Sequence, residues 1–176
     1  MITRDPVQQH VHTVVDSPYG PLTLVAAGGR LVGLYMEQQR HRPPQELLGE
    51  RGDGDEQPFG ETVRQLREYF DGRRTAFDLP LDPAGTPFQR TVWDALLEIP
   101  YGQTLSYGEL AARLGRPGAA RAVGLANGRN PIGIVIPCHR VVGSTGALTG
   151  YGGGLDRKQR LLDFEKQGAG QLAFPV

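Results

Sequence analysis

The chain contains one cysteine, Cys138, and a histidine follows it directly. A lone thiol beside an imidazole is a candidate nucleophile with its base, and a single cysteine has no disulfide partner within the chain. The alternative is packing, because free cysteines are among the most buried residues. Pro137, which fixes the backbone before the thiol, and the apolar run 132–136, which predicts a buried strand ending at a site, favour the nucleophile.

The charge of the chain is unevenly distributed, although its net value is zero. Residues 1–83 carry nine arginines against thirteen acidic residues, and residues 84–176 carry ten basic against six acidic residues. Between Leu110 and Leu155 there are five arginines and no acidic residue. A stretch of one sign beside the thiol is typical of a polyanion-binding protein, with a chance fluctuation of a few charges as the alternative.

The length of 176 residues is enough for one domain or two small ones. No run of about 18 apolar residues is present, and the first residues lead into no signal-peptide core, so we expect no membrane span. A single cysteine agrees with a reducing compartment. We therefore expect a cytoplasmic protein.

The first half predicts a small α+β domain over residues 1–83. Turn clusters at 17–20 and 28–29 separate short β-prone runs, which predicts an antiparallel meander with strands near 11–15, 22–26 and 31–35. Residues 37–57 lack periodicity and predict a surface loop or a partly disordered linker. Apolar residues at helical spacing then predict a helix ending at Gly72, followed by a short strand around 76–79.

The second half, residues 84–176, begins with clear helix signals. Thr86 with Gln89 and Ser106 with Glu109 each form a capping box, which predicts helices beginning at 87 and 107. A third short helix is expected over 119–126, and a last helix over about 156–167. Two short helices joined by a tight glycine-containing turn predict a mainly helical domain, similar to a winged helix-turn-helix.

The third helix is rich in small residues around one arginine, Arg121. Such a helix is suited to close approach to DNA, and packing against neighbouring helices is the alternative. Residues 143–154 are glycine-rich and predict a loop over a site.

The segment Pro137-Cys138-His139-Arg140-Val141-Val142, preceded by Arg121-Ala122-Val123-Gly124 and Asn130-Pro131, resembles the O6-alkylguanine-DNA alkyltransferases. This resemblance covers residues 86–166 and, more loosely, the first half. It implies repair of double-stranded DNA by irreversible transfer of an alkyl group from the O6 of a flipped-out guanine to the protein's own cysteine, once per chain.

The resemblance also implies roles for individual residues. Cys138 is the alkyl acceptor, His139 is the base that activates it through a water, and Glu165 orients His139. Asn130 holds the turn at the site, and Tyr107 contacts N3 of the guanine and a neighbouring phosphate.

The remaining implied roles concern DNA and the damaged base. Arg121 enters the base stack from a surface that includes Ala119, Ala120, Ala122 and Gly124. The base pocket is formed by Pro137, Val141, Tyr151 and Gly152, with the backbone carbonyl of Val141 facing the guanine amino group.

We expect no cofactor and no metal, because the N-terminal half has no cysteine and its three histidines, His10, His12 and His41, are a poor tetrahedral set. We expect a monomer, with side-by-side packing of several copies on DNA left open. Two other functions remain as alternatives: a non-catalytic lesion-binding protein, against which Cys138 argues, and a thiol-based alkylation or redox sensor. A sensor of that kind needs operator-specific base contacts, for which the third helix has few side chains.

Overall fold

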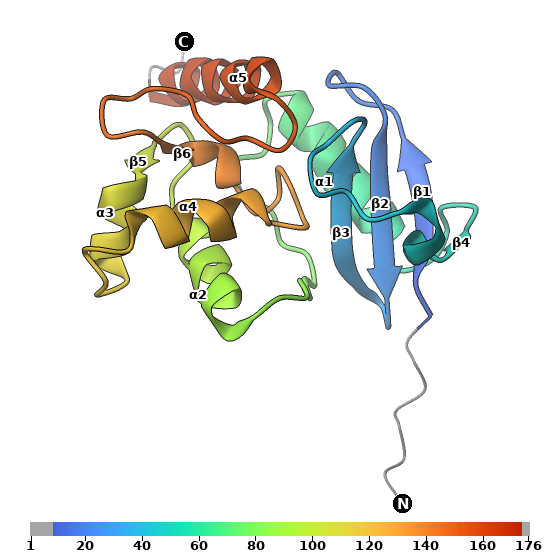
Figure 1. The fold of residues 1–176 in the computed structure, drawn as a ribbon. Coiled ribbons are helices and arrows are strands. Elements are labelled where there is room, and N and C mark those ends of the chain that lie inside the picture. Colours follow the sequence, from blue (N-terminus) through green and yellow to red (C-terminus); the bar gives the residue numbers. More distant parts are fainter. Residues whose placement is uncertain (1–8, 174–176) are drawn as a thin grey trace, which may run out of the picture.

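The computed structural model describes residues 9–173. A four-stranded sheet lies on one side of the molecule and a group of helices on the other (Figure 1). The sheet has the order β3-β2-β1-β4, formed by β1 (Val11–Val15), β2 (Leu22–Ala27), β3 (Arg30–Met36) and β4 (Glu50–Arg51). The first three strands form the predicted antiparallel meander. The α+β class is therefore confirmed.

The segment 37–57 is more ordered than the sequence predicted. It contains a 3₁₀ helix, η1 (Gln45–Leu48), and the strand β4, which pairs parallel with β1. Leu48 is buried against Val25 and Tyr35, and Gly49 has φ 79° where an added Cβ would lie 1.7 Å from the carbonyl oxygen of His10. One apolar anchor and one glycine at a close approach thus hold a segment whose composition suggested disorder.

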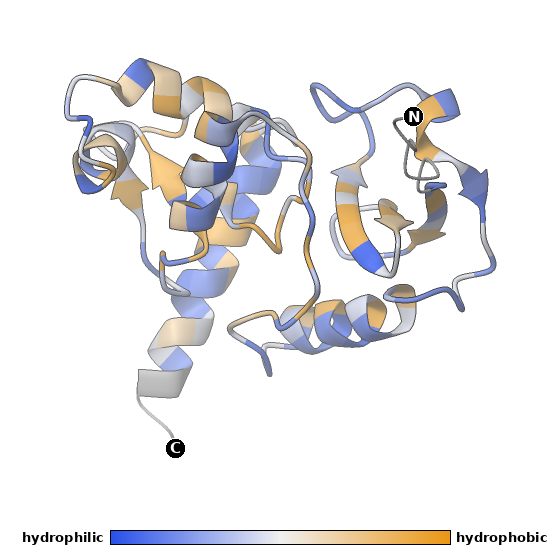
Figure 2. Cartoon of the chain, turned by 90° about the horizontal axis from the view of Figure 1, so that it is seen from below, coloured by the Kyte–Doolittle hydropathy of each residue, from blue (hydrophilic) through white to orange (hydrophobic). Residues whose placement is uncertain are grey.

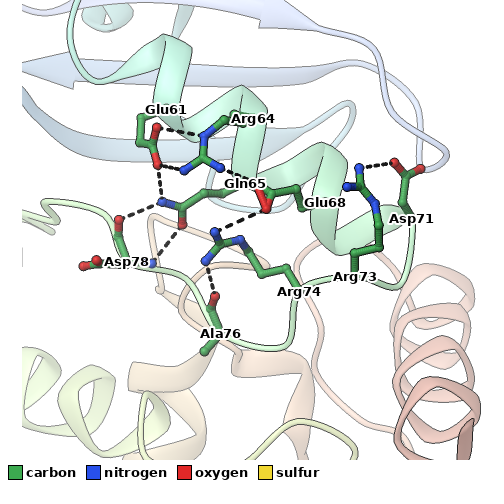
Figure 3. Close-up of polar contacts among 9 residues, drawn as sticks. All are labelled: Glu61, Arg64, Gln65, Glu68, Asp71, Arg73, Arg74, Ala76 and Asp78. Atoms are coloured by element: carbon green, nitrogen blue, oxygen red, sulfur yellow. Dashed lines mark hydrogen bonds and ion pairs between the residues drawn. The ribbon is translucent and has the colours of Figure 1, made fainter. Parts of the chain in front are cut away.

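Helix α1 (Phe59–Phe70) covers one face of the sheet. It carries both hydrophobic and hydrophilic residues along its length (Figure 2), and Phe59, Leu66 and Tyr69 are buried in the core that it shares with the sheet. The side chain of Gln65 donates to the carbonyl of Asp78 and accepts from its N–H, both at 2.8 Å (Figure 3). The predicted strand at 76–79 is absent: residue 76 lies in a bend and residues 77–79 have no regular secondary structure, and the Gln65 side chain bonds the backbone where a strand partner would.

The helical half follows its capping signals closely. Both predicted capping boxes are present, at the start of α2 (Pro87–Leu96) and of α3 (Tyr107–Arg113). After a tight turn comes α4 (Ala120–Gly128), and the long last helix is α5 (Leu155–Ala173). Two short strands, β5 (Leu105–Ser106) and β6 (Val141–Val142), pair in parallel. The helix-turn-helix prediction is thus met by α3 and α4.

The apolar run 132–136 is buried but forms turns, so the predicted strand is wrong. Asn130 explains the difference, because its side chain accepts from the N–H of Ile132 at 3.0 Å and donates to the carbonyl of Ile136 at 2.7 Å. Ile134 has φ 68°, which is incompatible with a strand. The run is therefore folded into a compact turn.

No helix within residues 9–173 is long and apolar enough to cross a membrane.

Candidate active site

The thiol lies in a one-turn 3₁₀ helix, η2 (Cys138–Arg140), which follows the compact turn. Cys138 is buried with 7% exposure, and burial raises the pKa of its thiol. A hydrogen bond with Asn130 and the positive charge of Lys158 act in the opposite direction and lower the pKa. A thiol with a raised pKa needs a base before it can act as a nucleophile.

An imidazole can serve as such a base, and that of His139, the next residue, is completely buried. Its Nε2 lies 2.9 Å from Oε2 of Glu165, which is on α5. Burial favours the neutral form of Glu165, but hydrogen bonds and charge from His139 and Arg140 outweigh it and hold the pKa of the carboxyl well below its ordinary value. The carboxylate is therefore ionised and fixes the orientation of the imidazole ring.

The other ring nitrogen of His139, Nδ1, is buried and has no hydrogen-bond partner among residues 9–173. Buried polar atoms of this kind are commonly satisfied by water. Because Nε2 is bound to Glu165, Nδ1 is the ring nitrogen that remains open to a water.

Arg140 also binds the carboxylate of Glu165. Its Nε donates to Oε1 of Glu165 at 2.8 Å and its Nη2 donates to Oε2 at 2.9 Å, while Nη1 donates to the carbonyl of Ile99 at 2.6 Å. By its position in the sequence, Arg140 is one of the five arginines predicted to face a polyanion. That interpretation is wrong for Arg140, because the side chain is buried and paired within the site.

Two asparagines hold the backbone around the thiol. Asn130 spans the compact turn that precedes it, as the resemblance implied, and Asn127 on α4 donates to the carbonyl of Cys138 at 3.3 Å. Asn127 was not predicted. Helix α4 and the backbone at Cys138 are thus linked by a direct side-chain contact.

Lys158 on α5 is fully buried and its Nζ donates to the carbonyls of Val141, at 2.6 Å, and Thr149, at 2.8 Å. Burial lowers the pKa of its ammonium group to about 8. The hydroxyl of Tyr107 donates to the same Thr149 carbonyl at 3.1 Å, and the Tyr107 ring lies 6.0 Å from Nζ. Lys158 therefore joins the strand after the thiol to the predicted glycine-rich loop.

The glycine-rich loop closes over the thiol. A cavity of about 10 Å³ beside Cys138 has room for roughly one water. It is lined by Gln39 from the sheet half, by Asn127 and Asn130, and by residues 150–153, which include the predicted pocket residues Tyr151 and Gly152. The N–H of Arg40 donates to the carbonyl of Gly152 at 2.8 Å. A purine base needs far more space than this cavity provides.

The predicted DNA-contacting residues lie on α4 and just before it, except Tyr107, which is the first residue of α3. Arg121 and Ala122 are exposed, and Ala119, Ala120 and Gly124 are partly exposed. The ring of Tyr107 lies within 3.6 Å of the position that a Cβ on Gly124 would take. A groove of about 540 Å³ extends from α4 across the loop, with Arg40 on its far side.

The structure therefore brings together the predicted residues Cys138, His139, Glu165 and Asn130, and Tyr151 and Gly152 line the same cavity as Cys138. Val141 and Tyr107 are joined to the site through Lys158 and the Thr149 carbonyl. Sequence reasoning missed three buried polar side chains, Tyr69, Lys158 and Asn127. A signal for Lys158 existed, because Lys158, Leu161 and Glu165 fall at i, i+3 and i+7 on the buried side of one helix. Among residues 9–173 no group of three His, Cys, Asp or Glu could hold a metal ion.

Comparison with known proteins identifies the family. Residues 87–167 match the 6-O-methylguanine DNA methyltransferase, DNA binding domain, and residues 10–83 match the ribonuclease-like domain of the same family. The chain belongs to the 6-O-methylguanine DNA methyltransferase family. A methylated-DNA–protein-cysteine methyltransferase of Mycobacterium tuberculosis is 53% identical over 158 residues, which cover 90% of this chain and 93% of the relative.

More distant relatives and solved structures agree with this membership. A methylated-DNA–protein-cysteine methyltransferase of Methanosarcina acetivorans is 46% identical and covers 88% of this chain and 97% of its own length. The crystal structure of the Mycobacterium tuberculosis protein OGT in complex with DNA matches with a TM-score of 0.82 and 52% identity, over 90% of this chain and 94% of that chain.

Proposed function

We propose that this protein repairs DNA by moving the alkyl group of an O6-alkylguanine in duplex DNA to Sγ of Cys138, once per chain. The observation that carries this proposal is the buried thiol whose neighbouring imidazole is fixed by an ionised buried carboxylate, 2.9 Å away. Membership of the 6-O-methylguanine DNA methyltransferase family supports the same reaction.

In the proposed reaction, His139 takes the proton of Cys138 through a water at Nδ1. The sulfur then attacks the alkyl carbon, an S–C bond forms and the C–O6 bond breaks with its electron pair going to the guanine. The guanine anion takes up one proton, which balances the proton lost by the thiol. The thioether product is stable, and a hydrolase would need a further water and an oxyanion hole to release it. The protein is therefore consumed by its reaction.

DNA binding by α4 would bring the damaged base to the thiol. The target atom lies inside the duplex, so the base must be flipped out. Arg121 is exposed on a helix of small residues and would fill the space that the base leaves. Because the cavity at Cys138 holds only about one water, residues 150–153 would have to move to admit the base. A glycine-rich loop is suited to that movement.

Tyr107 and the backbone carbonyl of Val141 are proposed to contact the guanine. The Val141 carbonyl already accepts from Lys158, and a carbonyl oxygen has a second lone pair for the guanine amino group. We also propose that the protein acts in the cytoplasm, where reducing conditions keep the thiol available.

The test of this function replaces the nucleophile. Cys138→Ser should lose methyl transfer from methylated duplex DNA, because the serine hydroxyl has a far higher pKa than a thiol and is a much weaker nucleophile toward an alkyl carbon. Its affinity for the duplex should be unchanged, since the proposed DNA-contacting residues lie on α3 and α4 and not on η2. Transfer by the Cys138→Ser protein at the normal rate would refute the assignment of the acceptor.

A further inference from the structure

The carboxylate of Glu165 has a third partner, which comes from the other half of the chain. The hydroxyl of Tyr69, at the end of α1, donates to Oε2 of Glu165 at 2.6 Å across 96 residues of sequence. Oε2 is the same oxygen that binds Nε2 of His139. Tyr69 is completely buried, and Glu165 is 1% exposed.

These contacts fix the carboxylate from three directions. Arg140 and His139 come from η2, the same turn as the nucleophile, so they could shift together with it. Tyr69 is different, because it belongs to the sheet half and is independent of η2. A hydrogen bond to an ionised group is stronger than one between neutral groups. Tyr69 therefore holds the Glu165 carboxylate independently of η2, and the carboxylate in turn orients the imidazole of His139.

Tyr69 is itself held in place by its surroundings. Its ring contacts Phe70, Phe77, Tyr101 and Phe164 with centroids 5.3 to 6.2 Å apart. The helix that carries it is tied to the next segment by the Gln65 contacts and by an ion pair of Glu68 with Arg74, whose side chain also bonds to the carbonyl of Ala76 within that segment (Figure 3).

The Tyr69 hydroxyl also stays protonated and can therefore donate a hydrogen bond. Burial, together with the nearby charge of Glu165, raises the pKa of Tyr69 well above its ordinary value. The hydroxyl therefore keeps its proton at every pH at which the protein works, and the carboxylate can only be the acceptor.

We propose that Tyr69 is a positioning residue for alkyl transfer, through which the sheet half of the chain orients the Glu165–His139 pair. This inference rests on the proposed roles of Cys138, His139 and Glu165. The N-terminal half of the chain, although distant from Cys138 in sequence, would thus help to orient the groups that activate the thiol.

The experiment compares Tyr69→Phe with Tyr19→Phe in reaction with free O6-benzylguanine, which requires neither DNA binding nor base flipping. Both substitutions remove one hydroxyl from the same aromatic cluster, and that of Tyr19 makes no hydrogen bond among residues 9–173. Tyr69→Phe should lower the maximal rate about fivefold with an unchanged half-saturating concentration, since only part of a charged hydrogen bond's energy is lost from the transition state. Tyr19→Phe should react at the normal rate.

A second comparison separates positioning from general support of the fold. In a Glu165→Gln background, Tyr69→Phe should cost less than about twofold, because residues that act through one another are not additive. Losses that multiply in the double variant would overturn the proposal, as would a normal rate for Tyr69→Phe. In either case a loss of transfer in Cys138→Ser would leave the proposed function intact.

A measurement on the unsubstituted protein is independent of how well the variants fold. The Tyr69 hydroxyl proton and the His139 Nε2 proton both bind Oε2, so proton NMR should show two slowly exchanging low-field resonances with a mutual nuclear Overhauser effect. The absence of this pair of resonances would contradict the proposed contact.

Discussion

Removing the guanidinium of Arg140 should cost more stability than any surface substitution in this chain. Arg140 is 6% exposed and makes two hydrogen bonds to Glu165 and one to the carbonyl of Ile99. In Arg140→Leu, the carboxylate keeps its burial but loses the one partner that is always positively charged. Breaking a buried ion pair in this way typically costs about 3–5 kcal/mol.

The Ile99 carbonyl would lose its hydrogen bond, which taken alone costs about 1–3 kcal/mol of stability. Protonation of Glu165 would offset part of the total, so we expect the free energy of unfolding to fall by about 4 kcal/mol. In a chain of this length, each kcal/mol lowers Tm by roughly 2–4 °C, which gives a fall of roughly 8–16 °C. Leu is close in size to the aliphatic stem of arginine, so the loss is mainly electrostatic.

Urea unfolding at pH 7, followed by the fluorescence of the single tryptophan, measures this loss. Trp93 is 2% exposed, so unfolding changes its environment strongly. Arg90→Leu is the matched control, because Arg90 forms an exposed ion pair with Asp82 at 3.8 Å. Such pairs contribute about 0–1 kcal/mol. A loss in Arg140→Leu no larger than in Arg90→Leu would refute the account of the buried carboxylate.

Three further outcomes follow from the same structure. Glu165→Gln should slow alkyl transfer and make the free energy of unfolding less dependent on pH in acid. The folded-state pKa of Glu165 is depressed, so the carboxylate stabilises the fold above its ordinary pKa of 4.5 and this stabilisation is lost as the pH falls. Urea unfolding between about pH 6 and 3 measures the difference. Arg121→Ala should slow repair of alkylated duplex strongly, single strands less, and free O6-benzylguanine not at all; equal losses in second-order rate on all three would exclude the insertion role. Affinity for duplex DNA should fall as the salt concentration rises. Four exposed arginines lie between residues 110 and 155, so the slope of log affinity against log salt should be no steeper than about −3.6. Binding that does not change with salt would contradict the charge argument.

Local chemistry explains which elements could be predicted from sequence. The helices α2 and α3 begin where Thr86 and Ser106 predict, because a capping box involves only residues three apart. The meander follows from turn residues between β-prone runs. The nucleophile and its histidine are adjacent in sequence, so their types alone indicated the chemistry.

Features that depend on distant partners were not predictable. The run 132–136 has the composition of a strand, but bonds of the Asn130 side chain and backbone bonds within the run fold it into a turn. Tyr69 fits the helical spacing of a core residue, and nothing in that pattern indicates that its hydroxyl meets Glu165. Arg140 has the charge of a phosphate-binding residue, and only burial beside Glu165 reveals its pairing.

The central claim is that Cys138 accepts one alkyl group per chain and is not regenerated. Intact-mass spectrometry of the protein after mixing with excess O6-methylguanine duplex tests it most directly, with peptide mapping to locate the added group. We expect every chain to gain one methyl group, on Cys138, and the loss of methyl from DNA to stop when the protein is fully modified. Continued loss of methyl from the duplex while the protein keeps its unmodified mass would contradict the account.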